Sequence, residues 1–577
     1  MQDPPENKEL PEIVQQYIKR LARRVHNRHM RRDVLAELRA HFADILADAP
    51  QDQDPHEQAQ SLVAEFGDVK LLGKLIKRAK KRCYPMWVKV IGYACRTIII
   101  AFVILVCYSI WFVRGKPTIS VDYLAKFNEM SRPAADKSLN AGPHYLRASE
   151  LFVPTTEVLT GLLRPSEGPG STPTAEKRRL LNKWISENRP AVEELRLGAT
   201  KPHCWFEYNT GVGDGQPGMI DLLIPKVGNI RNIGLVLCWR IQFSAEQGLW
   251  DSVNTDLQSL KKVAEHLMER PTLIEQLAGM GVDLWASQQL IYVLRNHSFP
   301  SESLDALAGT LSDSFTSGYP IADVSFKTLG LLDTVQRLFT DDGSGDGHFI
   351  PSAARRFLPI STLTTYSTHG YYLADMADPH FLMRAMIHPS RRETVEIILQ
   401  WQEKSDLYRS RTPYQNHVSG QSVDAWFLKI IEENPRNLFI KHRLPSLQRA
   451  VVMSYVGQTK HEADQATVAL LRYKAEHGRF PEKLNQLTPR YLQAVPQDPF
   501  GPGPLSYKRQ GHDFIIYSWG WNFEDHGGQH NRDVFRMRNQ EGDYVFWPPQ
   551  TIDTEKDARR RIAQTRAQRR RKSRRKR

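Results

Sequence analysis

Cysteine is scarce in this chain. Five cysteines among 577 residues are too few for the disulfide framework that holds small secreted domains together. Cys83, Cys95 and Cys107 lie in or beside one long apolar run. Cys204 and Cys238 lie beyond that run, and their positions in the sequence leave open whether they form a disulfide.

Signatures of catalysis are missing as well. The sequence contains no GxSxG, HExxH, P-loop or CxxC pattern. His369, His380 and His388 fall within one short segment, but their spacing matches no metal-ligand template, and structural roles explain them equally well. The sequence gives no mechanism for an enzyme, and we expect a non-catalytic protein.

Outside the C-terminal tail, the chain has almost no excess of positive charge. The last twenty residues contain twelve Arg or Lys and no acid, and they carry 12 of the 14 net positive charges. A surface that is basic throughout and coats nucleic acid is therefore excluded. Residues 551–577 cannot bury a core and are predicted to be disordered.

A single long apolar run extends from Trp87 to Val113, and the part after Arg96 carries no charge. About 20 apolar residues cross a hydrocarbon layer of about 30 Å. The uncharged part is slightly shorter, but Arg96 can snorkel toward the headgroups. Trp87 and Trp111 occupy the places of an aromatic belt. The run is predicted to be a transmembrane helix, and the alternative is a buried core helix.

The flanking charges predict an orientation. The run begins only at residue 87, which favours an uncleaved signal-anchor over a cleaved secretory signal. The segment before it is crowded with Lys and Arg, whereas only Arg114 and Lys116 follow it closely. The positive-inside rule places residues 1–86 in the cytoplasm and the residues after about 114 outside.

Residues 1–85 are predicted to form a helical module. Apolar residues recur with a 3.6-residue period in 13–25 and 34–46. A third helix is predicted to begin with Asp54 as N-cap and Pro55 at its first position, and to stop at Gly67.

This module resembles the permease-prefix or HAAS-type helical signalling domains of bacterial membrane proteins. The resemblance rests on RRDVLAELRAHFADIL and EQAQSLVAEFGDVKLLGKLI, and it implies protein contact or signal relay. Asp33, Glu37 and His41 share one helical face because they are four residues apart. That face is either a metal site or a solvated polar surface, and we favour the second interpretation.

Residues 118–443 are predicted to be mostly helical. Runs such as SVNTDLQSLKKVAEHLMER and TLIEQLAGMGVDLWASQQLIYVLRN have the helical period, without a fixed-length repeat. We expect a solenoid-like or irregular helical region, with a surface loop at 164–177.

The segment TDDGSGDGH contains a candidate cation site. Asp342, Ser344, Asp346 and Gly347 occupy the first, third, fifth and sixth positions of an EF-hand-type calcium loop. Ala353 stands at the twelfth position, where a Glu would close the coordination shell. The alternatives are a weak calcium loop and an acidic, glycine-rich surface turn.

Residues 444–550 are predicted to form an α+β domain. A helix from about Glu462 is expected to end at Gly478, and PQDPFGPGP is an extended connector because Pro denies helical and ladder hydrogen bonds. LSYKRQ and DFIIYSW are predicted to pair across the turn RQGHD, and VFRMR and DYVFW to extend this small antiparallel sheet.

This order of elements resembles the globular domain of type II secretion major pseudopilins, the G-type subunit, over about 90 of the 577 residues. The family's amino-terminal leader is absent before the span, the domain follows the span at a distance of about 350 residues, and its helix lacks the apolar filament-forming part. We therefore expect a reused extracytoplasmic module, not a filament subunit. The matching residues are Tyr473, Gly478, Phe480, Pro481, Pro496, Asp498, Pro499, Gly501, Tyr507, Tyr517, Ser518, Gly520, Gly527, Gly528 and Asp533.

The resemblance implies calcium in the loop before the last strand. Asn522 stands at the family's first acidic position, Glu524 and Asp525 are nearby, and Asp533 is retained. An amide oxygen can ligate calcium but brings no charge. The alternative is that these residues only form the turn and cap the final strand.

Together these patterns predict a single-pass protein of the bacterial cytoplasmic (inner) membrane, with a large extracytoplasmic scaffold or binding region. The alternative is an anti-sigma-like signalling transducer. The expected partners are the lipid bilayer, envelope proteins and, for the tail Arg559–Arg577, anionic lipids or acidic polymers, with no nucleic acid. A plain solubilising tail is the other interpretation of that segment.

Overall fold

The computed structural model describes residues 10–25, 28–49, 54–82, 86–155, 175–211, 218–225, 227–357, 364–367, 370–373, 379–443, 447–536 and 540–549. The protein is mostly helical and has small antiparallel sheets, as predicted. The chain divides into an N-terminal unit, Met1–Trp111, and a C-terminal unit, Phe112–Arg577. The predicted basic tail, His369 and most of the predicted loop 164–177 lie outside the described residues.

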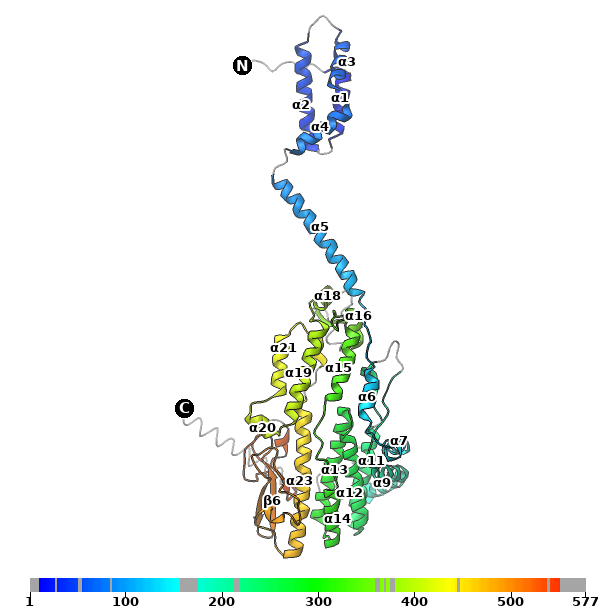
Figure 1. Cartoon of the computed structure of the whole chain (residues 1–577), viewed down its shortest axis with the longest axis vertical. Coiled ribbons are helices and arrows are strands. Elements are labelled where there is room, and N and C mark those ends of the chain that lie inside the picture. Colours follow the sequence, from blue (N-terminus) through cyan, green and yellow to red (C-terminus); the bar gives the residue numbers. More distant parts are fainter. Residues whose placement is uncertain are drawn as a thin grey trace, which may run out of the picture. The chain divides into compact units, whose positions relative to one another are not determined.

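The N-terminal unit contains the three helices predicted above, α1 (Glu12–Arg23), α2 (Arg28–Ala47) and α3 (Pro55–Phe66), followed by α4 (Val69–Arg82); all are drawn in blue in Figure 1. Asp54 caps α3 by accepting a hydrogen bond from the His56 backbone N–H, and Gly67 ends the helix with φ +84°. The unit has a core of its own, formed by Val14, Tyr17, Ile18, Leu21, Phe42 and Ala59.

Helix α5 (Met86–Val113) contains the apolar run. Its segment Val90–Val113 has a mean hydropathy of 2.4 and is long and apolar enough to cross a membrane, and its most apolar window is not buried. Ile98 and Phe102, for example, are 67% and 64% exposed. Apolar surface costs roughly 25 cal/mol per Å² in water, so an unburied helix of this composition is compatible with a single-pass membrane protein.

The C-terminal unit begins with a series of helices that pack as hairpins and bundles. Their bounds are α6 (Tyr123–Ser131), α7 (Gly142–Leu151), α9 (Ala175–Glu187), α10 (Arg189–Ala199), α11 (Val227–Glu246), α12 (Trp250–Met268), α13 (Leu273–Asn296), α14 (Ser301–Ser312), α15 (Ser325–Leu338), α16 (Pro351–Phe357), α18 (Pro379–Met386), α19 (Arg391–Arg409), α20 (Pro413–Val418), α21 (Val423–Glu433), α22 (Leu438–Arg443) and α23 (Gln448–His477). Two short hairpins interrupt them, β1 (Asn209–Thr210) with β2 (Leu222–Leu223), and β3 (Thr364–Ser367) with β4 (Gly370–Leu373).

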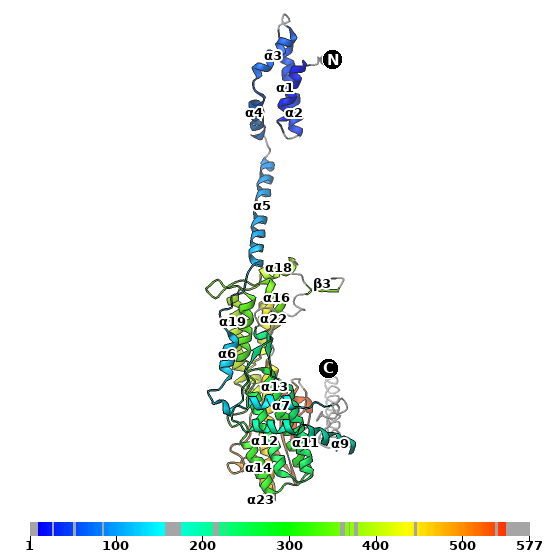
Figure 2. The same cartoon turned by 90° about the vertical axis from the view of Figure 1, so that its right-hand side faces the viewer.

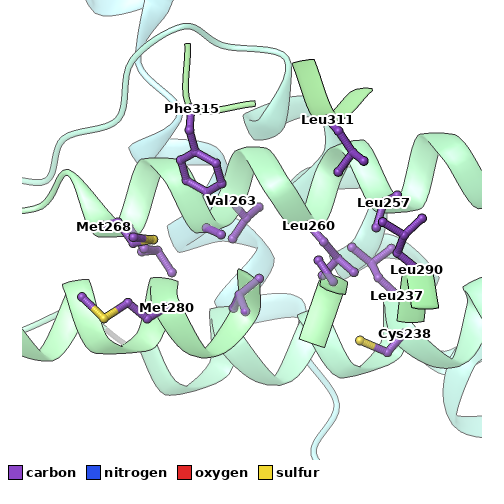
Figure 3. Packing of buried hydrophobic residues seen from close by; sticks show 14 of the residues in the cluster. Leu237, Cys238, Leu257, Leu260, Val263, Met268, Met280, Leu290, Leu311 and Phe315 are labelled. Carbon is purple, nitrogen blue, oxygen red and sulfur yellow. The ribbon is translucent and has the colours of Figure 1, made fainter. Parts of the chain in front are cut away.

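The main core of this unit lies between α11, α12, α13, α14 and α23. Leu260 and Val263 of α12, Met280 of α13 and Leu311 of α14 all belong to this cluster (Figure 3). Helices α12 and α13 approach closely at Gly279, where an added Cβ would lie 2.7 Å from the Ala264 carbonyl oxygen. Such a distance leaves no room for a side chain.

Helix α23 joins this bundle to the C-terminal sheet. It packs on α13 and α14 and also on β6 and β7, so the core of the bundle continues into the α+β part (Figure 1). The prediction that this helix begins near Glu462 was wrong, because α23 begins at Gln448. Its predicted end is confirmed, since Gly478 adopts φ +71° and its backbone N–H donates to the Lys474 carbonyl.

The C-terminal sheet has the order β5 (Ser506–Gln510), β6 (Asp513–Ser518), β7 (Tyr544–Trp547), and both pairings are antiparallel. The predicted hairpin across Gly511 and the strand at DYVFW are therefore confirmed. The prediction of a strand at VFRMR was wrong for the described residues of that segment. Val534 and Phe535 close a 3-10 turn, Arg532–Phe535, that Asn531 caps, and both side chains are buried in the core.

A second cluster of buried side chains lies among α15, α16, α18, α19 and α22. Phe112, the first residue of the C-terminal unit, belongs to it. Helices α16 and α18 are labelled in this region in Figures 1 and 2. We call it the Phe112 cluster; it includes Phe112, Leu338, Phe339, Phe349, Ala354, Phe381, Ala385, Ile398, Trp401 and Phe439.

Candidate functional sites

The predicted calcium loop at 342–347 is a closed turn whose carboxylates already accept hydrogen bonds. Asp342 Oδ1 accepts from the Ser344 backbone N–H and hydroxyl, both at 2.8 Å. Asp346 Oδ1 accepts from the Gly347 N–H at 2.8 Å and the Arg392 N–H at 3.1 Å. Hydrogen bonds from Ser344 lower the pKa of Asp342. Burial alone would raise the pKa of Asp346, but the hydrogen bonds from the Arg392 and Gly347 N–H groups outweigh it, so this pKa is lowered as well.

Two arginines at the start of α19 hold this loop. Arg391 forms an ion pair with Asp341, and the Arg392 guanidinium donates to the Ser344 carbonyl and hydroxyl, each at 3.2 Å. These arginines bring positive charge to the loop, and Arg391 pairs with Asp341, which is not among the predicted ligands. Calcium binding by Asp342, Ser344 and Asp346 stays a prediction.

The predicted C-terminal calcium residues each have partners within the loop. The Asn522 amide donates to the carbonyl oxygens of Gln540 (2.7 Å) and Gly542 (3.1 Å), and its oxygen accepts from the Glu524 N–H. Asp525 accepts from the Tyr517 hydroxyl at 3.0 Å and from the Gly527 N–H at 2.8 Å.

The remaining members of that predicted site lie at its edges. Glu524 has a side chain that is 73% exposed and lies 3.8 Å from His526. Asp533 is 3.1 Å from Arg536. Over the described part of the chain, no three His, Cys, Asp or Glu side chains are grouped as a metal site of those residue types requires. Whether either loop binds calcium through mixed carboxylate, amide and carbonyl oxygens therefore stays a prediction.

Two buried carboxylates organise the α+β domain, residues 444–550. Asp498 accepts from the Phe500 N–H (3.0 Å), the Ser518 hydroxyl (2.8 Å) and the Trp519 N–H (2.9 Å), so it ties the DPFG connector to the end of β6. Burial raises its pKa to about 6, although these three hydrogen bonds act in the opposite direction.

Asp543 has the same role at the glycine-rich loop. It accepts from the Gly528 N–H at 2.7 Å and from the His526 N–H at 3.1 Å, and burial raises its pKa to about 6. Asp498 was noticed in the sequence through the family resemblance, but Asp543 was not. Gly528 was a usable signal, because its φ of +88° favours glycine and aims its N–H at this carboxylate.

A buried charge cluster lies where α12, α13 and α23 meet, and no pattern in the sequence indicates it. Lys261 Nζ is 2.7 Å from Asp283 Oδ1, 3.8 Å from Asp464 Oδ2 and 3.5 Å from His461 Nδ1. The Tyr319 hydroxyl donates to Asp283 at 2.9 Å.

Burial controls the protonation of this cluster. It raises the pKa of Asp464 to about 6, and together with Lys261 it lowers the pKa of His461 to about 3. Lys261, Asp283 and Asp464 are at most 3% exposed, so they do not meet solvent in this structure. The cluster therefore joins three helices and offers no accessible reactive group.

The other ionisable candidates have structural surroundings. His388 Nε2 accepts from the Leu438 N–H at 3.1 Å, and burial lowers the pKa of this histidine to about 4. Asp33, Glu37 and His41 are all exposed, as the solvated-face interpretation requires. Nothing is described of the His380 side chain.

The two cysteines for which a disulfide was left open are both free thiols. Cys204 and Cys238 are buried, and burial raises the pKa of Cys204 to about 12. A thiol with so high a pKa is a poor nucleophile at neutral pH.

No protein-family model, curated protein or solved structure matches this chain.

Proposed function

We propose that this chain is a single-pass protein of a bacterial cytoplasmic membrane whose C-terminal unit is an extracytoplasmic scaffold that works through protein contacts. One observation carries the proposal. The apolar and unburied helix α5 stands in the sequence between a small helical module and a large compact unit, and each of these has a core of its own.

The chemistry of the large unit supports a binding role over a catalytic one. Its strongest constellation of ionisable groups, around Lys261, is closed to solvent, and its two accessible acidic loops are tied by backbone and arginine hydrogen bonds. The order α23, connector, β5–β6–β7 agrees with the pseudopilin-like elements expected from the sequence. That order supports a place near a secretion or envelope system, in a domain that does not polymerise.

A signalling role is the second candidate, and the N-terminal unit favours it. The four helices of that unit pack around their own core, and the Tyr17 hydroxyl donates to the Gly67 carbonyl at 2.8 Å, closing α1 onto the end of α3. A module that is compact without the remainder of the chain is suited to relay a signal to a cytoplasmic protein. Retention of a cytoplasmic partner by residues 1–85 alone, at the level seen with the full chain, favours the transducer.

The decisive experiment for the proposal is membrane topology. Alkaline phosphatase, active outside, and a fluorescent protein, active inside, are fused in turn after residues 80, 130 and 577. Cytoplasmic activity at 80 and external activity at 130 and 577 is the expected result. Cytoplasmic activity at 577 overturns the extracytoplasmic scaffold and makes nucleic acid the leading partner for the basic tail.

A span-breaking variant is the matched control. Ile99 and Val103 are 60% and 53% exposed on α5, and their replacement by Arg places two charges in the centre of the span. Each charge costs about 2.5–3.5 kcal/mol at the bilayer centre, so the Ile99→Arg, Val103→Arg chain is expected to leave the carbonate-resistant membrane fraction. If this variant stays in that fraction as firmly as the parent chain, α5 is not the anchor.

A further inference from the structure

The C-terminal unit starts with a residue that belongs both to the membrane helix and to a buried cluster. Phe112 is the penultimate residue of α5 and is 1% exposed. Its ring stacks on His348 with centroids 4.8 Å apart, and its carbonyl oxygen lies 3.3 Å from His348 Nε2. A Cβ at Gly115 would lie 2.8 Å from the same Nε2, so the chain also passes close to His348 just after the helix. No linker therefore separates the predicted span from the Phe112 cluster.

Helix α18 packs on that cluster with one of its faces. Phe381 and Ala385 are 5% and 1% exposed and belong to the same cluster as Phe112. Two residues after α18, His388 stacks on Phe349 at 4.6 Å and accepts a hydrogen bond from the Leu438 backbone. These contacts fix the position of α18 and leave its other face outward.

The outward side of α18 and of the first residue after it is apolar. Met383 is 59% exposed and Ile387, four residues later, is 51% exposed, so the two side chains lie one above the other. The helical hydrogen bond from the Ile387 N–H to the Met383 carbonyl, at 3.2 Å, keeps them in this arrangement. Arg384 beside them is exposed as well. Apolar side chains flanked by a cation are typical of helices that lie in the membrane interface.

We propose that α18 lies on the phospholipid surface at the point where the chain leaves the membrane. Met383 and Ile387 enter the boundary between headgroups and acyl chains, and Arg384 reaches the phosphates. The argument is continuity: Phe112, the penultimate residue of α5, packs in the cluster that also buries Phe381 and Ala385, so α18 and the end of α5 share one cluster. Trp111, 58% exposed and next to Phe112, is of the type enriched at that boundary.

This inference rests on the proposed membrane anchoring, and photo-crosslinking in the full chain tests it. Benzoylphenylalanine replaces Met383 in protein reconstituted into phosphatidylethanolamine–phosphatidylglycerol vesicles. The control carries the same group in place of Val418, which is 68% exposed at the end of α20. Helix α20 is tied to the C-terminal domain by the hydrogen bond from the Tyr414 N–H to the Pro499 carbonyl at 3.0 Å. We expect phospholipid adducts, identified by mass, at position 383 and none at position 418.

Three results overturn the inference: equal lipid adducts at 383 and 418, no adduct at 383, or an adduct from 383 to a second copy of the chain. The first would show unspecific labelling, and the third would make this face a protein interface. Failure of the anchoring itself is recognised separately, because the chain would then leave the membranes under alkaline carbonate.

A second variant tests the two apolar side chains directly. In a chain with benzoylphenylalanine at position 384, the double substitution Met383→Glu, Ile387→Glu is expected to abolish the lipid adducts. Both side chains are exposed, so the thermal unfolding of the chain should not change. Undiminished lipid adducts in this variant would show that Met383 and Ile387 do not hold the helix on the membrane.

Discussion

Lys261 and Asp283 form a 2.7 Å ion pair in the interior of the C-terminal unit, and their side chains are 0% and 2% exposed. Asp464 provides a second carboxylate 3.8 Å from the same nitrogen. Because the three residues come from α12, α13 and α23, one buried cation joins two consecutive helices to α23, which is distant from both in the sequence. Helix α23 also packs on strands β6 and β7 of the C-terminal sheet.

The substitution Lys261→Met is expected to destabilise the C-terminal unit strongly. It leaves two carboxylates buried without a cation, and breaking a buried ion pair from one side costs about 3–5 kcal/mol. Denaturant unfolding of the full chain in detergent, followed by tryptophan fluorescence, measures the effect. The control is Lys183→Met, since the Lys183 and Glu187 side chains are 73% and 44% exposed and their ion pair is worth about 1 kcal/mol or less. An equal loss of unfolding free energy in the two variants would show that the buried ion pair stabilises the fold no more than the exposed one.

Gly279 and Gly281 are expected to respond to alanine in opposite ways, although both lie in α13. A Cβ at Gly279 would lie 2.7 Å from the Ala264 carbonyl and 2.8 Å from the Met268 nitrogen, both backbone atoms of α12. A Cβ at Gly281 would meet only Arg231 Cδ at 4.0 Å. Gly279→Ala should cost about 1–3 kcal/mol through overpacking, while Gly281→Ala should stabilise the helix by up to about 1 kcal/mol. Thermal unfolding of the two variants compares them, and a stabilised Gly279→Ala would contradict the close approach of α12 and α13.

Asp498 should make the unfolding free energy depend on pH in an unusual direction. Its folded pKa of about 6 is above the ordinary value of 3.8, so the folded state holds more protons than the unfolded state between these two values. The contribution of this carboxyl to stability therefore rises as the pH falls through about 6 and is complete below about 4.

The comparison with Asp498→Asn isolates that contribution. Between about pH 7 and pH 4.5 the parent chain should gain about 2 kcal/mol relative to the variant, because one pKa unit corresponds to about 1.4 kcal/mol and pH 4.5 lies about 1.5 units below the folded pKa. Other titrating groups, such as Asp464 and His461, cancel in the difference. Glu524→Gln is the control, since its side chain is 73% exposed and is not buried in the core. A flat difference for Asp498→Asn would show that this carboxyl is not desolvated.

Elements whose signals lie in consecutive residues could be predicted from the sequence. Asp54, Pro55 and Gly67 mark the two ends of α3, and Gly478 and Gly511 mark the end of α23 and the turn of the β5–β6 hairpin. Each signal acts through the backbone of its own segment, so no knowledge of the tertiary structure was needed.

The beginning of α23 shows why other elements were missed. Ser454, Thr459 and His461 make residues 448–461 look polar, yet all three are buried. The Ser454 hydroxyl donates to the Ala450 carbonyl and accepts from the Ala322 N–H at 2.9 Å, so its polarity is satisfied inside the core. A helix surrounded by protein on several sides has no clear apolar stripe, and its pattern fails to show the helix.

The burial of the ionisable residues in the candidate sites could not be predicted from the sequence, for a related reason. Lys261 lies next to Lys262, and a Lys-Lys pair in an amphipathic helix indicates a solvated face. Its burial depends on Asp283, 22 residues away, and on Asp464 in α23. Such a partnership exists only after the helices have packed. The family resemblance, by contrast, pointed to Asp498 and to the loop around Asn522 before any contact was known.

Asn522 leads to the sharpest test of the calcium prediction. Its amide nitrogen donates to the carbonyl oxygens of Gln540 and Gly542, at 2.7 Å and 3.1 Å. Asn522→Asp replaces this donor by an anionic oxygen facing two carbonyl oxygens. In the absence of a cation the variant should lose about 1–3 kcal/mol or more, because both carbonyls lose their partner and repel the new charge.

Calcium should reverse that loss if the loop 522–533 is a cation site. Carboxylate and carbonyl oxygens are the ligands that calcium prefers, and the substitution supplies the negative charge that the amide lacks. Thermal unfolding in EGTA and in millimolar calcium is compared for the parent chain, Asn522→Asp and the exposed control Asn485→Asp. We expect a calcium-dependent rise that is larger in Asn522→Asp than in the parent chain and absent from Asn485→Asp. If calcium leaves Asn522→Asp as unstable as EGTA does, the loop lacks the further ligands, and Glu524, Asp525 and Asp533 act only in shaping the turn before β7.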